Sequence, residues 1–541
     1  MGRAGVGDGG RAAGARLGCL EVLRRVDAHW DEAGDGVTAG LGQRAVPDRI
    51  DQLTAGRLEL HGFGGATSED GVHLSLGQLG DLVDRTLLVV RETHHHHLVK
   101  FLLGLIFHHQ LGSGRDRLRQ AFEHVVRCHD GHLTRFVAAG PRGGRRLGRL
   151  AGGGRGVLGL AIGAAACGGT TTVIDFVEPE PDQRLMDALN QRILQAKGRA
   201  VVDFALHMTL TNDHEDILSE LPQLMQAGCT SFKTYLTYAG FSLNDSELIH
   251  ILEAVNSNHG LVMVHAENDA MVNHLTKKLL SEGKTAPKYH AIARPVLAEG
   301  EAIHRAVTLA KIVQAPIYIV HISSLLGVKA LKTAQDMGAR AYGETCPQYL
   351  LLSDEEYQKA GFEGAKFVCS PPLRKEADQQ ALWDAISHGI IQTVATDHCS
   401  FFYSGQKDLG SDNFSLIPGG LPGIEARLSL MHTFGVCTNR ISLNRWVEIC
   451  CTAPAQLFGL FPQKGSLQIG SDADIVLFDP NRELIVTKDT FHEHVDYTPY
   501  EGLKIQGAPR TVILRGEPIF QDCQFVGKAG AGKYLHCREF A

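Results

Sequence analysis

The feature that most constrains the fold is an alternation, from residue 164 onward, of short apolar runs with longer amphipathic segments. Seven runs are typical of strands: TTVIDFV (171–177), VVDFALHM (201–208), SFKTYLTY (231–238), LVMVHAEN (261–268), PIYIVHIS (316–323), RAYGETC (340–346) and TVATDH (393–398). Strands that each precede a helix predict a parallel sheet covered by helices. Seven or eight such units favour a closed (β/α)8 barrel of the TIM type over an open sheet. One strand, the first, is missing if that barrel is to close.

The pattern changes beyond residue 465. GSLQIGSDADIVLFDP and RTVILRGEPIF alternate strand-like runs with turn residues, which predicts a small appended β-sandwich domain. We therefore expect a barrel over residues 164–460 and a C-terminal β domain with its tail over residues 461–541.

Residues 1–163 differ in composition from the rest. They are rich in Gly and Arg, as in GPRGGRRLGRLAGGGRG, yet hold a single lysine, Lys100. Arginine without lysine is what GC-rich DNA gives when it is translated in a non-native frame, so this segment is interpreted as partly or wholly foreign to the rest of the chain. The alternative is a genuine basic extension without a packed core.

Composition narrows the class of protein. The 541 residues are 44% apolar and 21% charged, and the net charge is −7, as in a globular protein with one large core and a smaller domain. No apolar run approaches the roughly 20 residues that span a bilayer, and no signal peptide is recognisable, so we expect a cytoplasmic protein. The 12 cysteines show no paired CxxC, which favours reduced thiols. The acidic balance does not favour a nucleic-acid partner.

Polar residues follow several of the apolar runs. Lys233, His265, His321 and Asp397 lie at or near the ends of four predicted strands. Because the strand ends of such a barrel face one volume, these side chains are expected to converge. A single histidine there is usually structural, but two histidines with an aspartate are suitable ligands for zinc or a similar divalent ion.

Lys233 is the unusual member of this group. An ammonium in an apolar interior must be paired, change its pKa or be chemically modified. One alternative is that Lys233 lies at the wet end of its strand and points into solvent. The other is that its deprotonated amine captures carbon dioxide, which gives a carbamate that can bridge two metal ions.

The same residues carry a family resemblance. AAACGGTTTVIDF, SFKTYLTY, VHAEND, TAPKYHAIARP, YIVHISS, ETCPQYLLL, SPPLR, ATDHC, IPGGLPGIEAR and GSDADIVLFDP occur in the order found in dihydropyrimidinases and hydantoinases of the amidohydrolase superfamily. From about residue 164 to the C-terminus the chain resembles that branch, and several motifs resemble its D-phenylhydantoinase members. Residues 1–163 show no resemblance to it.

The resemblance implies a metal-dependent cyclic amidase. It implies two divalent ions, usually zinc, that carboxylated Lys233 bridges, with His265 and His321 on one ion and Asp397 on the other. Asp397 would also move the proton during ring opening. The family tyrosine that stabilises the oxyanion corresponds to Tyr238, whose alternative role is that of an aromatic core residue. Ser370 corresponds to a residue that contacts the cyclic imide.

Two positions depart from the family. Gly419 stands where asparagine is usual, and glycine can keep a contact made through the backbone. The first barrel strand of the family ends in a His-x-His pair, but the corresponding window here reads AAGPRGGRRLG. The upstream cluster RETHHHHLVK pairs His94 with His96 and His95 with His97, far from that window. His108 and His109 are adjacent and would point in opposite directions from a strand.

Several functions therefore stay open at this point. The leading one is hydrolysis of hydantoins or dihydropyrimidines to N-carbamoyl amino acids. An allantoinase-like or dihydroorotase-like hydrolase is a neighbour within the enzyme class. A scaffold protein related to dihydropyrimidinase is the non-catalytic alternative, because the His-x-His pair is absent. The resemblance also implies a homotetramer and a small cyclic imide or ureide as substrate.

Overall fold

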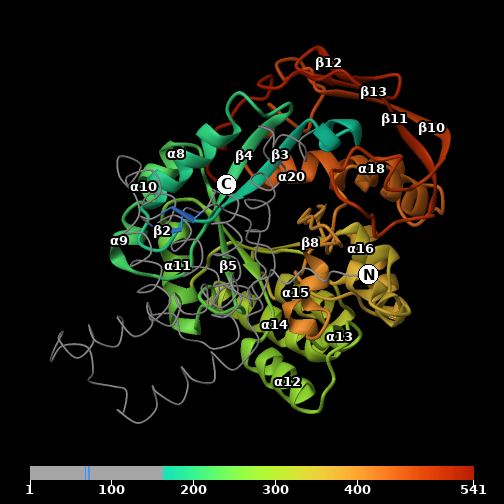
Figure 1. Ribbon diagram of the computed structural model, residues 1–541. Coiled ribbons are helices and arrows are strands. Elements are labelled where there is room, and N and C mark those ends of the chain that lie inside the picture. The colour runs from blue at the N-terminus through green and yellow to red at the C-terminus, as the bar shows by residue number, and fades with distance from the viewer. Residues whose placement is uncertain (1–66, 69–70, 73–162, 541) are drawn as a thin grey trace, which may run out of the picture. The chain divides into compact units, whose positions relative to one another are not determined.

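A parallel sheet of seven strands forms the centre of the computed structural model, which describes residues 67–68, 71–72 and 163–540 (Figure 1). Its strands follow one another in chain order. They are β3 (Thr172–Val177), β4 (Asp203–Thr209), β5 (Ser231–Tyr235), β6 (Leu261–His265), β7 (Ile317–Ile319), β8 (Ala341–Thr345) and β9 (Thr393–Val394). All seven predicted strands and their parallel pairing are confirmed.

The strands are apolar on both faces because both faces are covered. Every residue of β4, β5 and β6 is buried, as expected where helices cover one face and the barrel interior fills the other. In β6, Val262 and Val264 belong to the core shared with the helices. Leu261 and Met263 belong to a second cluster with Tyr318. Alternation along the strand therefore sets His265 on the same face as Leu261 and Met263.

Helices follow the strands and form the outer layer. They are α8 (Leu185–Ala196), α9 (Glu215–Leu218), α10 (Leu221–Gln226), α11 (Asp245–Ser257), α12 (Asp269–Ser281), α13 (Tyr289–Ala293), α14 (Val296–Ile312), α15 (Leu325–Asp336), α16 (Pro347–Leu351) and α17 (Glu376–Ser387). Local chemistry fixes where they begin. Asn244 caps α11, since its side chain accepts a hydrogen bond from the Glu247 backbone N–H and the Glu247 carboxylate accepts one from the Asn244 N–H.

Shorter helices occupy the connections and the region after β9. They are the 3₁₀ helices η1 (Asp354–Gln358), η2 (Glu363–Phe367), η3 (Lys407–Gly410) and η4 (Phe414–Leu416), the α-helices α18 (Arg427–Met431), α19 (Leu443–Val447) and α20 (Ala453–Leu457), and the π-helical turns η5 (His432–Val436) and η6 (Glu448–Thr452). None of the helices within residues 163–540 combines the length and the apolar composition that crossing a membrane requires.

The appended β domain forms one antiparallel sheet among residues 163–540, whereas the predicted sandwich needs a second sheet and stays a prediction. Its strands are β10 (Ile475–Ile485), β11 (Lys504–Leu514), β12 (Glu517–Gln521) and β13 (Gln524–Phe525), paired in that order. Lys464 is buried and its ammonium donates to Asp203, at the start of β4, and to Asp474, just before β10, at 2.7 Å each. The chain then returns to the barrel, where Tyr534 bridges to Phe204 of β4, and Figure 1 marks the C-terminal end beside β4.

Two described strands lie outside this unit. The chain divides into two compact units, residues 1–121 and 122–541, and the first contains the two-residue strands β1 (Thr67–Ser68) and β2 (Gly71–Val72), which pair antiparallel. The histidine cluster 94–97, His108 and His109 lie outside the described residues. The window AAGPRGGRRLG lies outside them too, so the expectation of a missing first strand stays a prediction.

Candidate metal centre at the strand ends

Lys233 lies in the middle of β5, where it pairs with Thr209 of β4 and Met263 of β6. Its side chain is 3% exposed, and the ammonium nitrogen lies 3.5 Å from the centroid of the Tyr235 ring. The solvent-facing alternative for Lys233 is therefore wrong. Burial lowers the pKa of Lys233 to about 7, although the negative charges of Asp397, Glu344 and Glu178 act to raise it. About half of an amine with such a pKa is neutral, and therefore nucleophilic, near neutral pH.

The two predicted histidines lie next to each other. His265 ends β6 and His321 follows β7, and their ring centroids are 4.5 Å apart. Burial lowers the pKa of His265 to about 4 and that of His321 well below its usual value. Both imidazoles are therefore neutral, which is the form that binds metal ions. Nδ1 of His321 is buried and has no hydrogen-bond partner among the described residues.

Asp397 follows β9 and is partly exposed. Burial of its carboxyl group, together with repulsion from Glu344, raises the pKa of Asp397 to about 7, against the attraction of Lys233. Asp397 and His321 both have a left-handed backbone, with φ of 46° and 41°. That conformation costs a non-glycine residue about 1 kcal/mol or more and is concentrated at functional sites. The sheet holds these two side chains in place at an energetic cost.

The residues predicted to bind substrate lie beside the histidines. The Tyr238 ring centroid is 5.0 Å from that of His265, and Tyr238 also has a left-handed backbone, with φ of 81°. Burial raises the pKa of Tyr238, while a hydrogen bond with Ser370 acts to lower it. A Cβ added to Gly419 would lie 3.4 Å from Ser370 Oγ. The structure thus brings Tyr238, Ser370 and Gly419 together.

Comparison with known proteins shows which family the chain belongs to. The model of the amidohydrolase family matches residues 155–519. The chain belongs to the amidohydrolase family. It is 42% identical to a D-hydantoinase of Streptomyces coelicolor over 372 residues, which are 69% of this chain and 79% of that protein. A D-hydantoinase of Geobacillus stearothermophilus is 45% identical over 69% of this chain and 79% of its own length. A D-phenylhydantoinase of Escherichia coli O1:K1 is 44% identical over 70% and 82%.

The solved structures that resemble this amidohydrolase are also dihydropyrimidinases and hydantoinases. The crystal structure of dihydropyrimidinase from Brevibacillus agri superposes with a TM-score of 0.70 at 43% identity and covers 71% of this chain and 84% of that one. An L-hydantoinase from Arthrobacter aurescens superposes with a TM-score of 0.66 at 30% identity over 70% and 83%. The barrel fold predicted from the seven repeats is confirmed by these relatives.

Three carboxylates of the amidohydrolase site were missed by the sequence analysis. Glu344 lies within the window RAYGETC, and its carboxylate accepts hydrogen bonds from the Tyr318 hydroxyl at 2.7 Å and the His321 N–H at 3.2 Å. Glu178 is buried directly after β3. Glu267 is fully buried, lies 2.8 Å from Nε2 of His265 and pairs with Arg294. Glu178 directly follows β3 and Glu344 lies next to the last residue of β8, and this position at a strand end was the signal that could have found those two.

The charge of Glu267 is fixed by its partners. Burial alone would raise the pKa of Glu267, but the charge of Arg294 and the hydrogen bond with His265 lower it to about 2. Glu267 is therefore ionised and accepts a hydrogen bond from His265 Nε2–H, which selects the tautomer of His265 whose Nδ1 carries a free lone pair. Neutral imidazoles, a lysine of low pKa and the unpartnered His321 Nδ1 together fit a site for divalent cations.

Lys407 holds the loops of the predicted substrate residues. It is fully buried, and its ammonium donates to the carbonyls of Val368 and Pro418 at 2.9 Å each. Ser370 lies two residues after Val368, and Gly419 directly follows Pro418. Burial lowers the pKa of Lys407 to about 7. One lysine thus connects the two loops whose backbones are predicted to contact the substrate.

We expect this burial to make stability depend on pH. The lysine of the unfolded chain titrates near pH 10, so between about pH 7 and about pH 10 the unfolded state binds more protons and the free energy of unfolding rises with pH. The stability of the wild type relative to Lys407→Met should therefore increase from about pH 7 to about pH 9, as measured by urea unfolding. Lys332→Met, which removes a lysine that is 51% exposed, should follow the wild type at every pH. A constant difference between the wild type and Lys407→Met would contradict the prediction.

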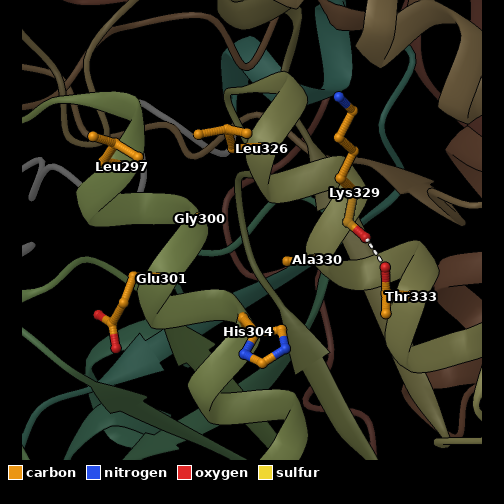
Figure 2. Close-up of a pocket in the computed structure, with 8 residues that line it drawn as sticks. All are labelled: Leu297, Gly300, Glu301, His304, Leu326, Lys329, Ala330 and Thr333. Atoms are coloured by element: carbon orange, nitrogen blue, oxygen red, sulfur yellow. Dashed lines mark hydrogen bonds between the residues drawn. The ribbon is translucent and has the colours of Figure 1, made fainter.

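A surface hollow lies elsewhere on the molecule. Figure 2 shows it between α14 and α15, with Leu297, Gly300 and His304 on one helix and Leu326 and Lys329 on the other. Its volume is about 400 Å³. Because both helices belong to the outer layer, this hollow is separate from the strand-end residues described above.

Proposed function

We propose that this amidohydrolase opens the ring amide of hydantoins and dihydropyrimidines and yields N-carbamoyl amino acids. The observation that carries the proposal is the burial of Lys233 in β5 of the same sheet in which His265 ends β6, His321 follows β7 and Asp397 follows β9. The relatives support the same reaction class. The chain matches about four-fifths of the length of each of them, and they are named D-hydantoinase and D-phenylhydantoinase.

The proposed metal ligands are Lys233, His265, His321 and Asp397. Two divalent ions, which we propose to be zinc, would supply an activated nucleophile at neutral pH and polarise the ring carbonyl. The low pKa of Lys233 supports its carboxylation, in which the neutral amine attacks carbon dioxide, a C–N bond forms and one proton leaves. The product is an anion, so the modification also removes a positive charge from the interior.

The remaining steps belong to side chains of this chain. Asp397 would take the proton from the attacking water and deliver it to the ring nitrogen as the C–N bond breaks. Tyr238 stays protonated because its pKa is raised, so its hydroxyl can donate a hydrogen bond to the developing oxyanion. The backbones at Ser370 and Gly419 would hold the cyclic imide, in the positions that Lys407 maintains.

The charge of the site favours a neutral cyclic substrate. A substrate with a carboxylate would need a free arginine. In the described part of the chain, the buried arginines are Arg294 and Arg374. Arg294 pairs with Glu267, and Arg374 pairs with Glu299. Neither guanidinium has an uncompensated charge. This favours hydantoins and dihydropyrimidines over dihydroorotate.

A panel of substrates tests the proposal. The full chain, purified after growth with zinc, is incubated with hydantoin, dihydrouracil, allantoin and dihydroorotate, and each ring opening is followed by chromatography. We expect turnover of hydantoin and dihydrouracil only. Preferred turnover of allantoin or dihydroorotate would favour the neighbouring hydrolases. No turnover of any substrate, even after the ligand pair is restored as described in the Discussion, would favour the non-catalytic scaffold.

The domain division and the assembly are also proposals. We propose a hydrolase barrel over residues 164–460, a C-terminal β domain and tail over 461–541, and an atypical segment over 1–163. The family match over residues 155–519 supports the first two. We further propose a cytoplasmic homotetramer that takes a small molecule as its substrate.

A further inference from the structure

Three side chains with metal-binding atoms meet outside the strand-end centre. Cys167 lies in the helical turn before β3, Glu425 lies just before α18, and His492 lies between β10 and β11. One ligand atom from each, a sulfur, a carboxylate oxygen and an imidazole nitrogen, lies within 4.8 Å of the other two. Residues more than 300 positions apart in the chain thus form one compact cluster. None of the three belongs to the predicted catalytic set.

Backbone contacts hold this cluster together. Both carboxylate oxygens of Glu425 face His492: Oε2 accepts a hydrogen bond from the His492 backbone N–H at 2.6 Å, and Oε1 lies 2.8 Å from Nδ1 of the ring. A Cβ added to Gly168, the residue after Cys167, would lie 2.5 Å from the carbonyl oxygen of Glu425. Since the two backbones are nearly in contact there, the thiol and the carboxylate have fixed relative positions.

The donor atoms suit a divalent ion that accepts sulfur and nitrogen. Zinc binds thiolate at about 2.3 Å and imidazole or carboxylate at about 2.1 Å, which places tetrahedral ligand atoms roughly 3.5 Å apart. No separation in the cluster is larger than 4.8 Å, so none exceeds this value by much more than 1 Å, which is within the reach of side-chain rotation. The thiolate and the carboxylate together balance the double positive charge. The charges therefore match as well as the distances.

Access to the cluster is open on one side. Cys167 and Glu425 are buried, whereas the side chain of His492 is 42% exposed. An ion can enter past the histidine, and a water molecule can occupy the fourth position from that side. Burial and the charge of Glu425 raise the pKa of the Cys167 thiol, so binding would release the thiol proton to solvent.

We propose that Cys167, Glu425 and His492 form a second site for a divalent cation, and that the site takes zinc or another ion that binds thiolate. The ion joins the turn before β3 and the segment before α18 to a loop of the C-terminal domain. It therefore fastens that domain to the barrel, independently of the strand-end centre and of catalysis.

Cobalt tests this site separately from the strand-end centre. A cobalt ion bound to a cysteine thiolate has an intense charge-transfer absorption in the near ultraviolet, whereas the proposed ligands at the strand ends contain no sulfur. The full chain is stripped of metal with a chelator and titrated with cobalt. We expect the band in the wild type, its absence in Cys167→Ser and at least roughly 10-fold weaker cobalt affinity in His492→Gln.

Two comparisons keep the result decisive. Cys399→Ser is the matched control. It removes a thiol that lies two residues from the proposed strand-end ligand Asp397 and outside the second site, so this variant should keep the band. Since His492 is half exposed, His492→Gln is expected to fold even if Cys167→Ser does not. The absence of a band in the wild type, its persistence in folded Cys167→Ser or an unchanged affinity in His492→Gln would each overturn the proposal.

Discussion

Replacing residues 1–163 by a designed segment whose strand ends in His-x-His should raise the metal bound at the strand-end centre to about two ions, in addition to any ion at the Cys167 cluster, and speed hydantoin opening about 100-fold or more. The reason is the number of ligands. Among the described residues, the proposed ligands are one lysine, two histidines and one aspartate, and the window that should hold two further histidines reads AAGPRGGRRLG. A site that lacks two ligands holds its metal weakly. Elemental analysis and a chromatographic assay of the unaltered and grafted chains measure both effects.

The graft also adds a strand, so its effect needs a control. The same segment with both histidines replaced by alanine adds the strand without the ligands. If ligand loss is the cause, this control should recover stability but hold as little metal as the unaltered chain. About two ions in the unaltered chain beyond the one proposed at Cys167, Glu425 and His492 would contradict the prediction, because ligands would then come from residues outside the described range.

The barrel could be predicted because two independent signals in the sequence identify each strand. Each of the seven runs is apolar enough to be buried on both faces, and each precedes a segment with helical periodicity, so order and pairing followed from the pattern. The run RTVILRGEPIF likewise predicted β11 and β12. The short π-helical turns η5 and η6 could not be predicted, because tertiary contacts rather than periodicity determine where a helix widens.

The candidate site could be predicted only in part. Lys233, His265 and His321 were identifiable because polar residues at the ends of apolar strands are rare. Glu267 was not, because a glutamate two residues beyond a strand is common in exposed loops. Only the fold reveals that Arg294, which is distant in the chain, compensates its charge. Cys167, Glu425 and His492 were missed for the same reason, since their proximity depends on the docking of the C-terminal domain.

The second large effect is expected at Lys233. Lys233→Ala should reduce hydantoin opening by about a thousand-fold or more in the grafted chain and lower metal content in both chains, because a bridging ligand supplies several kcal/mol of transition-state stabilisation. Two roles must be distinguished. As a carbamate, Lys233 would carry negative charge and bind metal. As an ammonium, it would only neutralise Asp397, Glu344 and Glu178, whose charges act on it.

Lys233→Arg separates these roles. A guanidinium keeps the positive charge but stays protonated and cannot capture carbon dioxide, so Lys233→Arg should be as inactive as Lys233→Ala. The grafted wild type, supplied with ¹³C-labelled bicarbonate, should also give a carbamate resonance that both variants lack. Lys332→Ala, at an exposed lysine paired with Asp336, should keep activity and the resonance. Activity in Lys233→Arg, or no resonance in an active wild type, would show that Lys233 is a structural counter-charge, since the positive charge alone would then suffice.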